Sequence, residues 1–208
     1  MPPTDKSSAK TKLLDAALTV IRSQGYAATT VDELCAAAGV TKGAFFHHFK
    51  SKEHLGVAAA DYWSETTGGF FDEAPYNQLP DPLDRVLAYI DFRKALLEGP
   101  LPEITCLVGT MVQETYDSSP AIRDACERCM SAHCAKVEAD ISEAIETYGI
   151  ETPWTADSLA LYTQAVVQGA LILAKAHNDT RVARDSFDHL RRYVELLFNR
   201  RPQKEIVQ

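Results

Sequence analysis

Residues 30–49 restrict the fold more than any other stretch, because they hold two short helical segments joined by a tight turn. Thr30 is placed to cap the first segment, and Glu33 three residues later completes a capping box. Gly39 supplies the positive φ that the turn needs, and Thr41 is placed to cap the second segment. The pattern predicts a helix-turn-helix, a unit whose second helix enters the major groove of DNA.

Apolar residues indicate how these two helices pack together. Val40 is expected to anchor the turn, while Leu34 and Ala38 face Phe45 and Phe49. The predicted DNA-binding set comprises the exposed residues of the second helix, together with the cap of the first helix and the lysine that opens the next one. Its members are Thr30, Thr41, Lys42, Gly43, Ala44, Phe46, His47, His48 and Lys52.

Each side chain type in this set suits one part of the duplex. Thr41 and the helix N-terminal amides suit a phosphate, Lys42 a phosphate or a guanine edge, and Ala44 a thymine methyl. His47 and His48 point about 100° apart on a helix, so a shared metal ion is not expected. The alternative for these histidines and the nearby lysines is a solvated helix end.

Nearly the whole chain shows helical periodicity, and strand-like alternation is absent. We predict an all-α fold of about nine helices, with an N-terminal three-helix helix-turn-helix domain at residues 1–55. Residues 56–208 are expected to form a larger helical domain for effector binding and dimerisation. The expected helices cover about 8–24, 31–38, 42–49, 52–74, 83–97, 103–116, 120–148, 155–177 and 182–200.

Charge is distributed unevenly along the 208 residues. The formal net charge is −8, yet residues 1–55 hold seven Lys/Arg and five Asp/Glu, while the remainder holds 14 and 24. A slightly basic module on an acidic body indicates that only the module faces a polyanion.

Several classes of protein are disfavoured by the sequence. No convergent acid/base or nucleophile motif appears, so neither enzymatic activity nor a cofactor is expected. No uninterrupted apolar run reaches about 18 to 20 residues and no secretory signal is evident, which predicts a cytoplasmic protein without a membrane partner. Five cysteines without small-scaffold spacing predict free thiols.

The segment from about residue 8 to 58 resembles the TetR family of bacterial transcriptional repressors. The resemblance is carried by Thr30-Val31, Ala37-Ala38-Gly39-Val40-Thr41-Lys42-Gly43, Phe46-His47-His48-Phe49 and Lys52-Glu53-His54-Leu55. It implies a homodimer on palindromic operator DNA, with a ligand cavity in the C-terminal body and release on effector binding. Phe46 stands where the family usually has tyrosine, so His47 or His48 is expected to take over a phosphate contact.

Aromatic and polar residues between about 60 and 175 are candidates for the effector cavity, although each is more often a core residue. They are Trp63, Phe70, Tyr89, Phe92, Met111, Gln113, Glu114, Tyr116, Trp154 and Tyr162. Two stripes on the last two helices predict the dimer interface, with intramolecular core as the alternative: Gln168, Gly169, Ile172 and Leu173, then Phe187, Leu190, Val194 and Leu197.

The cysteines suggest two further hypotheses. Cys126, Cys129 and His133 share one helix face, and a metal- or redox-responsive regulator is the alternative function, although a packed thiol face is favoured. Cys106, predicted in the first turn of a helix, is a candidate electrophile sensor whose thiolate Lys175 would stabilise, and an inert buried cysteine is the alternative. Its surroundings resemble a TetR subgroup that includes the N-ethylmaleimide reductase repressor.

Overall fold

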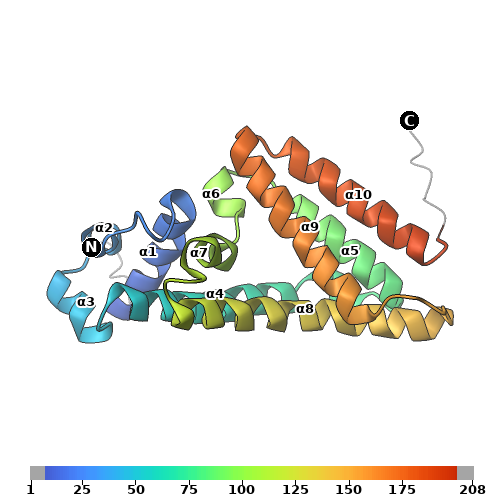
Figure 1. Cartoon of the computed structure of the whole chain (residues 1–208), viewed down its shortest axis with the longest axis horizontal. Helices are drawn as coiled ribbons and strands as arrows, with labels where there is room; N and C mark the ends of the chain where they lie inside the picture. The colour runs from blue at the N-terminus through green and yellow to red at the C-terminus, as the bar shows by residue number, and fades with distance from the viewer. Residues whose placement is uncertain (1–7, 201–208) are drawn as a thin grey trace, which may run out of the picture. The chain divides into compact units, whose positions relative to one another are not determined.

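A computed structural model describes residues 8–200 and is helical throughout, with no strand among those residues. Ten α-helices and one 3-10 helix follow one another along the chain (Figure 1). They are α1 (Ala9–Gln24), α2 (Val31–Ala38), α3 (Lys42–His48), α4 (Lys52–Asp72), η1 (Pro75–Gln78), α5 (Pro82–Ala95), α6 (Leu101–Ile104), α7 (Leu107–Thr115), α8 (Pro120–Tyr148), α9 (Ala156–His177) and α10 (Arg181–Leu197). The all-α prediction is confirmed.

The helix count differs from the prediction at one place. A single helix was expected over about 103–116, but the chain ends α6 at Ile104 and restarts at Leu107. Cys106 therefore lies at the N-cap of α7 in extended backbone, and not within a first turn. Its Sγ accepts a hydrogen bond from the Gly109 N–H at 3.4 Å, as a capping side chain does.

The chain divides into two compact units. The first comprises residues up to Phe70 together with 105–130, and the second comprises 71–104 and the residues from 131 onward. The first unit has a core of fully buried side chains from α1, α2, α3, α4, α7 and α8: Leu13, Ile21, Leu34, Phe45, Leu55, Leu107, Met111 and Ile122. Here the three N-terminal helices share a core with α7 and the start of α8.

The second unit is built around α5, α9 and α10. Phe187, Leu190 and Val194 on α10 are at most 2% exposed within one protomer, which corrects their assignment to the dimer interface. They belong to the intramolecular core because α10 packs against both α5 and α9.

Helix α9 is strongly apolar, although its sequence contains no uninterrupted apolar run of 18 residues. Among residues 8–200 it alone is long and apolar enough to cross a membrane, with a mean hydropathy of 1.3 over 18 residues. Only 39% of that window is buried in the protomer. Two glutamines, Gln164 and Gln168, interrupt its sequence, which is why no continuous run was visible.

Candidate DNA-binding surface and ligand pocket

The helix-turn-helix forms because each of its helices begins at a capping side chain. The Thr30 hydroxyl accepts from the Glu33 N–H at 3.2 Å, and the Glu33 carboxylate accepts from the Thr30 N–H at 2.8 Å. These bonds hold the pKa of Glu33 below its usual value. Gly39 has φ of 64°, and the Thr41 hydroxyl accepts from the Ala44 N–H at 3.1 Å. Local sequence thus determines where α2 ends and α3 begins.

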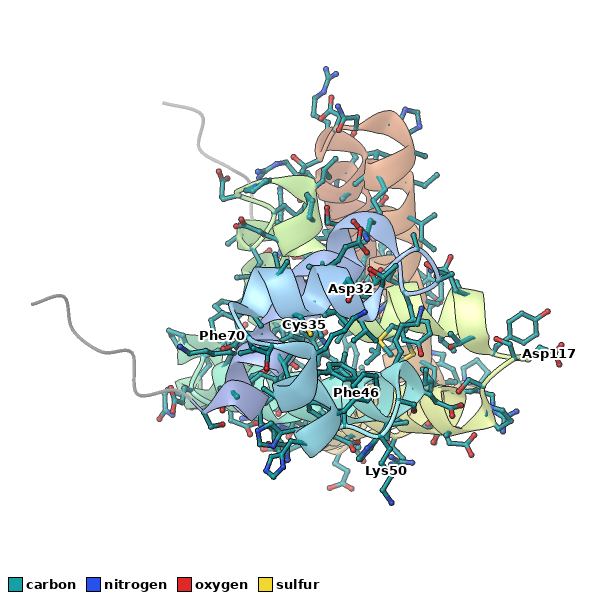
Figure 2. The ribbon with its side chains drawn as sticks, turned by 90° about the vertical axis from the view of Figure 1, so that its left-hand side faces the viewer. Asp32, Cys35, Phe46, Lys50, Phe70 and Asp117 are labelled. Atoms are coloured by element: carbon teal, nitrogen blue, oxygen red, sulfur yellow. The ribbon has the colours of Figure 1, made fainter. Side chains whose placement is uncertain are left out.

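The outer face of α3 carries the predicted DNA contacts. Phe45 and Phe49 are buried, whereas Thr41, Lys42 and Gly43 are exposed. Phe46 is 56% exposed, and its ring meets that of Phe45 edge-on at 5.1 Å between centres. Figure 2 shows Phe46 in the same view as Lys50, which follows α3 and is also exposed.

Two lysines of the predicted set already have partners. Lys42 pairs with Asp32 at 2.7 Å, and both side chains are exposed, so the pair can open at little cost. Lys52 is different, because its Nζ donates to the carbonyls of Tyr26, Ala27 and Thr29 at 2.9 to 3.3 Å. These contacts tie Lys52 to the turn before α2, and its predicted contact with the DNA backbone stays a prediction.

Within the first unit, α7 and the residue before α8 bond to the segments on either side of the helix-turn-helix. The Glu114 carboxylate accepts from the Ala27 N–H at 2.6 Å. The Ser119 hydroxyl, just before α8, donates to the Glu53 carboxylate at 2.5 Å. Sequence reasoning considered Glu114 only as a ligand contact, because nothing local in the sequence connects residues 27 and 114.

The second unit contains a pocket of about 210 Å³ between the end of α4, η1, α5 and α8. Its wall is aromatic: the rings of Tyr76 and Tyr89 lie 5.8 Å apart, and those of Phe71 and His133 lie 4.9 Å apart. Val86 and Val137 add aliphatic surface. Of the predicted cavity residues, Tyr89 lines this pocket.

Polar groups in the pocket wall are paired with one another. The Tyr89 hydroxyl and His133 Nε2 are 2.8 Å apart. Burial, with the nearby charges of Arg93 and Lys136, lowers the pKa of His133 to about 3, so the imidazole is neutral at physiological pH. Lys136 pairs with Asp72 at 2.5 Å.

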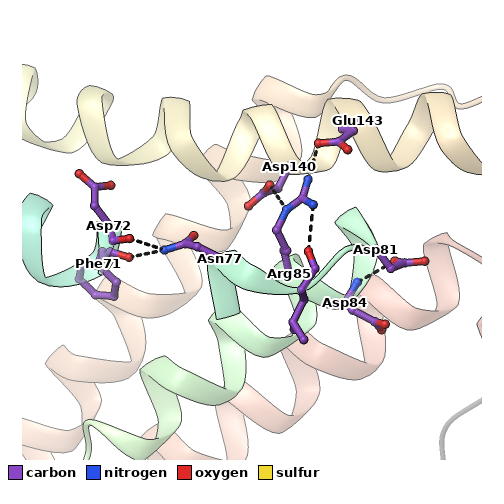
Figure 3. Close-up of polar contacts among 9 residues, drawn as sticks. Phe71, Asp72, Asn77, Asp81, Asp84, Arg85, Asp140 and Glu143 are labelled. Carbon is purple, nitrogen blue, oxygen red and sulfur yellow. Dashed lines mark hydrogen bonds and ion pairs between the residues drawn. The ribbon is translucent and has the colours of Figure 1, made fainter. Parts of the chain in front are cut away.

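A second paired group includes the lining residue Asp140 (Figure 3). Arg85 pairs with Asp140 at 2.6 Å and also with Glu143. The Asn77 side-chain amide donates to the carbonyls of Phe71 and Asp72, at 2.7 and 3.0 Å, and so caps the C-terminal end of α4.

The other predicted effector residues lie elsewhere. Phe92 stacks edge-on against Phe71 and Tyr76, outside the set that lines the pocket. Trp63 lies beneath the Arg22 guanidinium, Met111 is buried in the core of the first unit, and the Gln113 side chain donates to the Gly109 carbonyl. Trp154 packs against Phe198 and Tyr162 packs against Tyr193. Phe70 and Tyr116 are exposed. His133 was considered only as a metal ligand, and its role in the pocket wall was missed.

The cysteines differ in accessibility. All five are free, and Cys106 is the only one that is not buried. Burial raises the pKa of Cys126 to about 12 and also raises that of Cys129. Lys175 lies in the last turn of α9, in the second unit, whereas Cys106 belongs to the first, so their predicted interaction stays a prediction.

The metal alternative is not supported by the geometry. Cys126 and Cys129 pack in the core of the first unit, and the ring of His133 is bound to Tyr89. Residues 8–200 contain no group of three His, Cys, Asp or Glu side chains placed to hold one ion.

A second surface of interest lies on α9 and α10. Exposed apolar side chains gather there, and the rings of Tyr162 and Tyr193 are 5.2 Å apart. Gly169, in the middle of α9, has open space where a Cβ would lie. The exposed apolar residues are Leu161, Tyr162, Ile172, Leu173, Tyr193 and Leu196.

Comparisons with known proteins match both parts of the chain. The family model described as "Bacterial regulatory proteins, tetR family" matches residues 13–59, and "Tetracyclin repressor-like, C-terminal domain" matches residues 82–190. The HTH-type transcriptional repressor DhaR of Mycobacterium sp. (strain GP1) is 27% identical over 164 residues, which are 78% of this chain and 80% of DhaR.

Other matches are shorter or structural. An HTH-type transcriptional regulator of Bacillus subtilis, YerO, is 39% identical over 54 residues, which cover 26% of this chain and only 19% of YerO. The crystal structure of reduced NemR from Escherichia coli superposes with a TM-score of 0.75 and 22% identity, over 88% of this chain and 95% of NemR. At that identity the likeness shows the shared fold.

Proposed function

Because the chain belongs to the TetR family of bacterial regulatory proteins, we propose that it is a homodimeric transcriptional repressor released from a palindromic operator by an effector. The observation that carries the proposal is the exposed face of α3, which presents Phe46 and Lys42 from a doubly capped helix-turn-helix. A helix presented in this way suits the major groove. The repressor named DhaR supports the direction of control.

The exposed surface of α9 and α10 supports the homodimer. It carries exposed apolar side chains on both helices, and Gly169 on α9 has open space at its Cβ position, where a second helix can approach closely. A two-fold dimer places its α3 helices in half-sites about one helical turn apart.

Binding to DNA from upstream of the protein's own gene tests this proposal, with fluorescence anisotropy as the readout. The informative variant is Phe46→Ala, and its control is Phe70→Ala, which removes a similarly exposed ring (48%) from α4 (Figure 2). We expect Phe46→Ala to weaken binding at least tenfold and Phe70→Ala to leave it unchanged. Equal effects of the two variants would contradict the role of α3.

Thiol modification at Cys106 is a second proposed route of release, supported by its accessibility among the five cysteines. Serine also caps helices well, so Cys106→Ser preserves the start of α7. We expect N-ethylmaleimide to release DNA from the wild type and not from Cys106→Ser. Release from both proteins, or from neither, would leave reversible ligand binding as the mode of induction.

A further inference from the structure

The pocket of the second unit is defined by its size, its aromatic wall and the pairing of its charges. This inference rests on the proposed function and deepens it, because it names the class of effector. Each of these three properties restricts the ligand in a different way.

Size limits the ligand to a single ring. An apolar cavity of about 150 Å³ in another protein holds benzene. The pocket here measures about 210 Å³, which adds room for a substituent of a few heavy atoms. A fused polycyclic molecule or a long acyl chain would extend beyond this volume.

The wall favours an aromatic ligand. Phe71, Tyr76 and Tyr89 present rings to the pocket, and the distances between their centres are 5.8 to 6.0 Å in tilted or edge-on geometry. Aromatic rings add further rings in the same offset or edge-to-face arrangements. Val86 and Val137 close the wall with aliphatic groups.

Charge pairing favours a neutral ligand. Asp140 is held by Arg85 in a pair that is largely shielded from solvent, so an ionic ligand near it would have to break that pair or remain unpaired. Lys136 and Asp72 also neutralise each other, although both side chains are exposed. His133 adds no charge, since its burial keeps the imidazole neutral. Arg93 lies over the Phe71 ring, 5.2 Å from its centre, and is not among the residues that line the pocket.

One polar side chain of the lining, that of Asn77, leaves an acceptor available for a hydroxyl. The amide nitrogen of Asn77 is fixed by two main-chain carbonyls, those of Phe71 and Asp72. The assignment of its nitrogen and oxygen is therefore determined by bonding, and Oδ1 points away from those carbonyls as an acceptor. A hydroxyl on the ligand supplies the matching donor.

We infer that the pocket between α4, η1, α5 and α8 binds a small, neutral, hydroxyl-bearing monocyclic aromatic molecule, of the phenol or aromatic alcohol class. The ring packs against Phe71, Tyr76 and Tyr89, and the hydroxyl donates to Asn77 Oδ1. Such a ligand contacts the last turn of α4, the helix that begins directly after the helix-turn-helix.

Three probes of nearly equal size test the charge class: benzyl alcohol, benzoate and benzylammonium. Isothermal titration calorimetry on the full chain without DNA measures each dissociation constant. We expect benzyl alcohol to bind at least tenfold more tightly than either ion. A preference for benzoate would mean that Arg93 reaches the ligand, and a preference for benzylammonium would mean that the carboxylates do; either result overturns the inference.

Variants test the location and the hydroxyl contact. Val137→Phe fills the pocket and is expected to abolish binding of benzyl alcohol, whereas Val182→Phe, at the start of α10, leaves it unchanged. Asn77→Ala is expected to lower the ratio of benzyl alcohol affinity to toluene affinity at least fivefold. Toluene contacts the same aromatic wall but has no hydroxyl. If Asn77→Ala failed to fold, it would bind neither benzyl alcohol nor toluene, and the comparison of Val137→Phe with Val182→Phe would then test the location of the site.

Ligand binding in the pocket and ligand-induced release from DNA can be tested separately. Binding of benzyl alcohol that is lost in Val137→Phe establishes the pocket whether or not DNA is released. Saturation with benzyl alcohol that leaves DNA affinity unchanged would contradict the effector role and keep the ligand class. No heat of binding for any aromatic probe, or equal binding by Val137→Phe and wild type, would overturn the inference itself.

Discussion

The carboxylate of Glu114 on α7 accepts a hydrogen bond from the main-chain N–H of Ala27, just before α2, at 2.6 Å. Gly25 lies beside the same carboxylate at φ of 90°, and a Cβ at that position would collide with Glu114. The turn before α2 is therefore held by a residue from the C-terminal part of the sequence, within one compact unit. A movement of α7 would therefore act directly on the turn that leads into the helix-turn-helix.

Removal of that carboxylate is expected to weaken the first unit. Glu114→Ala leaves the Ala27 N–H to solvent, and we expect the free energy of unfolding to fall by about 1 kcal/mol. Glu151→Ala, in the exposed segment before α9, is the control and is expected to have no effect. Urea denaturation measures both, and equal stability of the two variants would contradict a structural role for Glu114.

Lys50 and Lys52 are expected to separate DNA binding from stability. Lys52→Met loses three charged hydrogen bonds to carbonyls, and we expect the free energy of unfolding to fall by about 2 kcal/mol. Lys50→Met, at an exposed position, is expected to leave stability unchanged and to reduce the slope of log affinity against log salt by about 0.9. The reverse pattern would show that Lys52 is the phosphate contact.

Gly169 tests the proposed dimer surface. A Cβ at this position meets open space, and leucine has a higher helix propensity than glycine, so Gly169→Leu is not expected to destabilise the folded chain. We expect the dimer dissociation constant from sedimentation equilibrium to rise at least tenfold, because a second α9 can no longer approach closely. Gly69→Leu, at another helical glycine with open space around it, is the matched control. A dimer unaffected by Gly169→Leu would place the interface elsewhere.

His133 makes stability depend on pH. The folded imidazole has a pKa of about 3, whereas the unfolded one titrates near its ordinary 6.5, so the unfolded chain binds the additional proton between these values. Acidification from pH 7 to 5 therefore favours unfolding, by about 2 kcal/mol from this residue. Arg93 and Lys136 act in the same direction as burial, and Asp72 opposes them.

Comparison with His133→Phe isolates this contribution from the other titrating groups. We expect the variant to lose less stability than the wild type between pH 7 and 5, by about 2 kcal/mol, as measured by denaturant unfolding at each pH. Identical losses would mean that the His133 imidazole is protonated in the folded state at pH 5.

The local part of this structure could be predicted from the sequence, and the long-range part could not. Thr30, Gly39 and Thr41 act on neighbours within four residues, so caps and turns were visible in the sequence. The pocket depends on His133 meeting Phe71 and Tyr89 from two other helices, which no local pattern indicates. The carbonyl partners of Lys52 were not visible for the same reason, since they lie more than 20 residues away in the sequence.

The break between α6 and α7 has a related cause. Residues 103–116 carry a helical pattern throughout, but Cys106 adopts an extended conformation and caps a new helix. The stripe on α10 was likewise visible, yet its spacing alone could not say whether it faces the same protomer or a second copy. Burial of Phe187 and Val194 within one protomer decides that question.

The central claim is that α3 reads a symmetric DNA sequence as part of a dimer. Selection of bound sequences from a random pool of duplex DNA by the full-length protein tests it most directly. We predict an enriched palindrome whose half-site centres lie about 10 base pairs apart, and loss of that enrichment for Phe46→Ala but not for Phe70→Ala. A pool that shows no enriched symmetric sequence, or the same enrichment for both variants, would contradict the account.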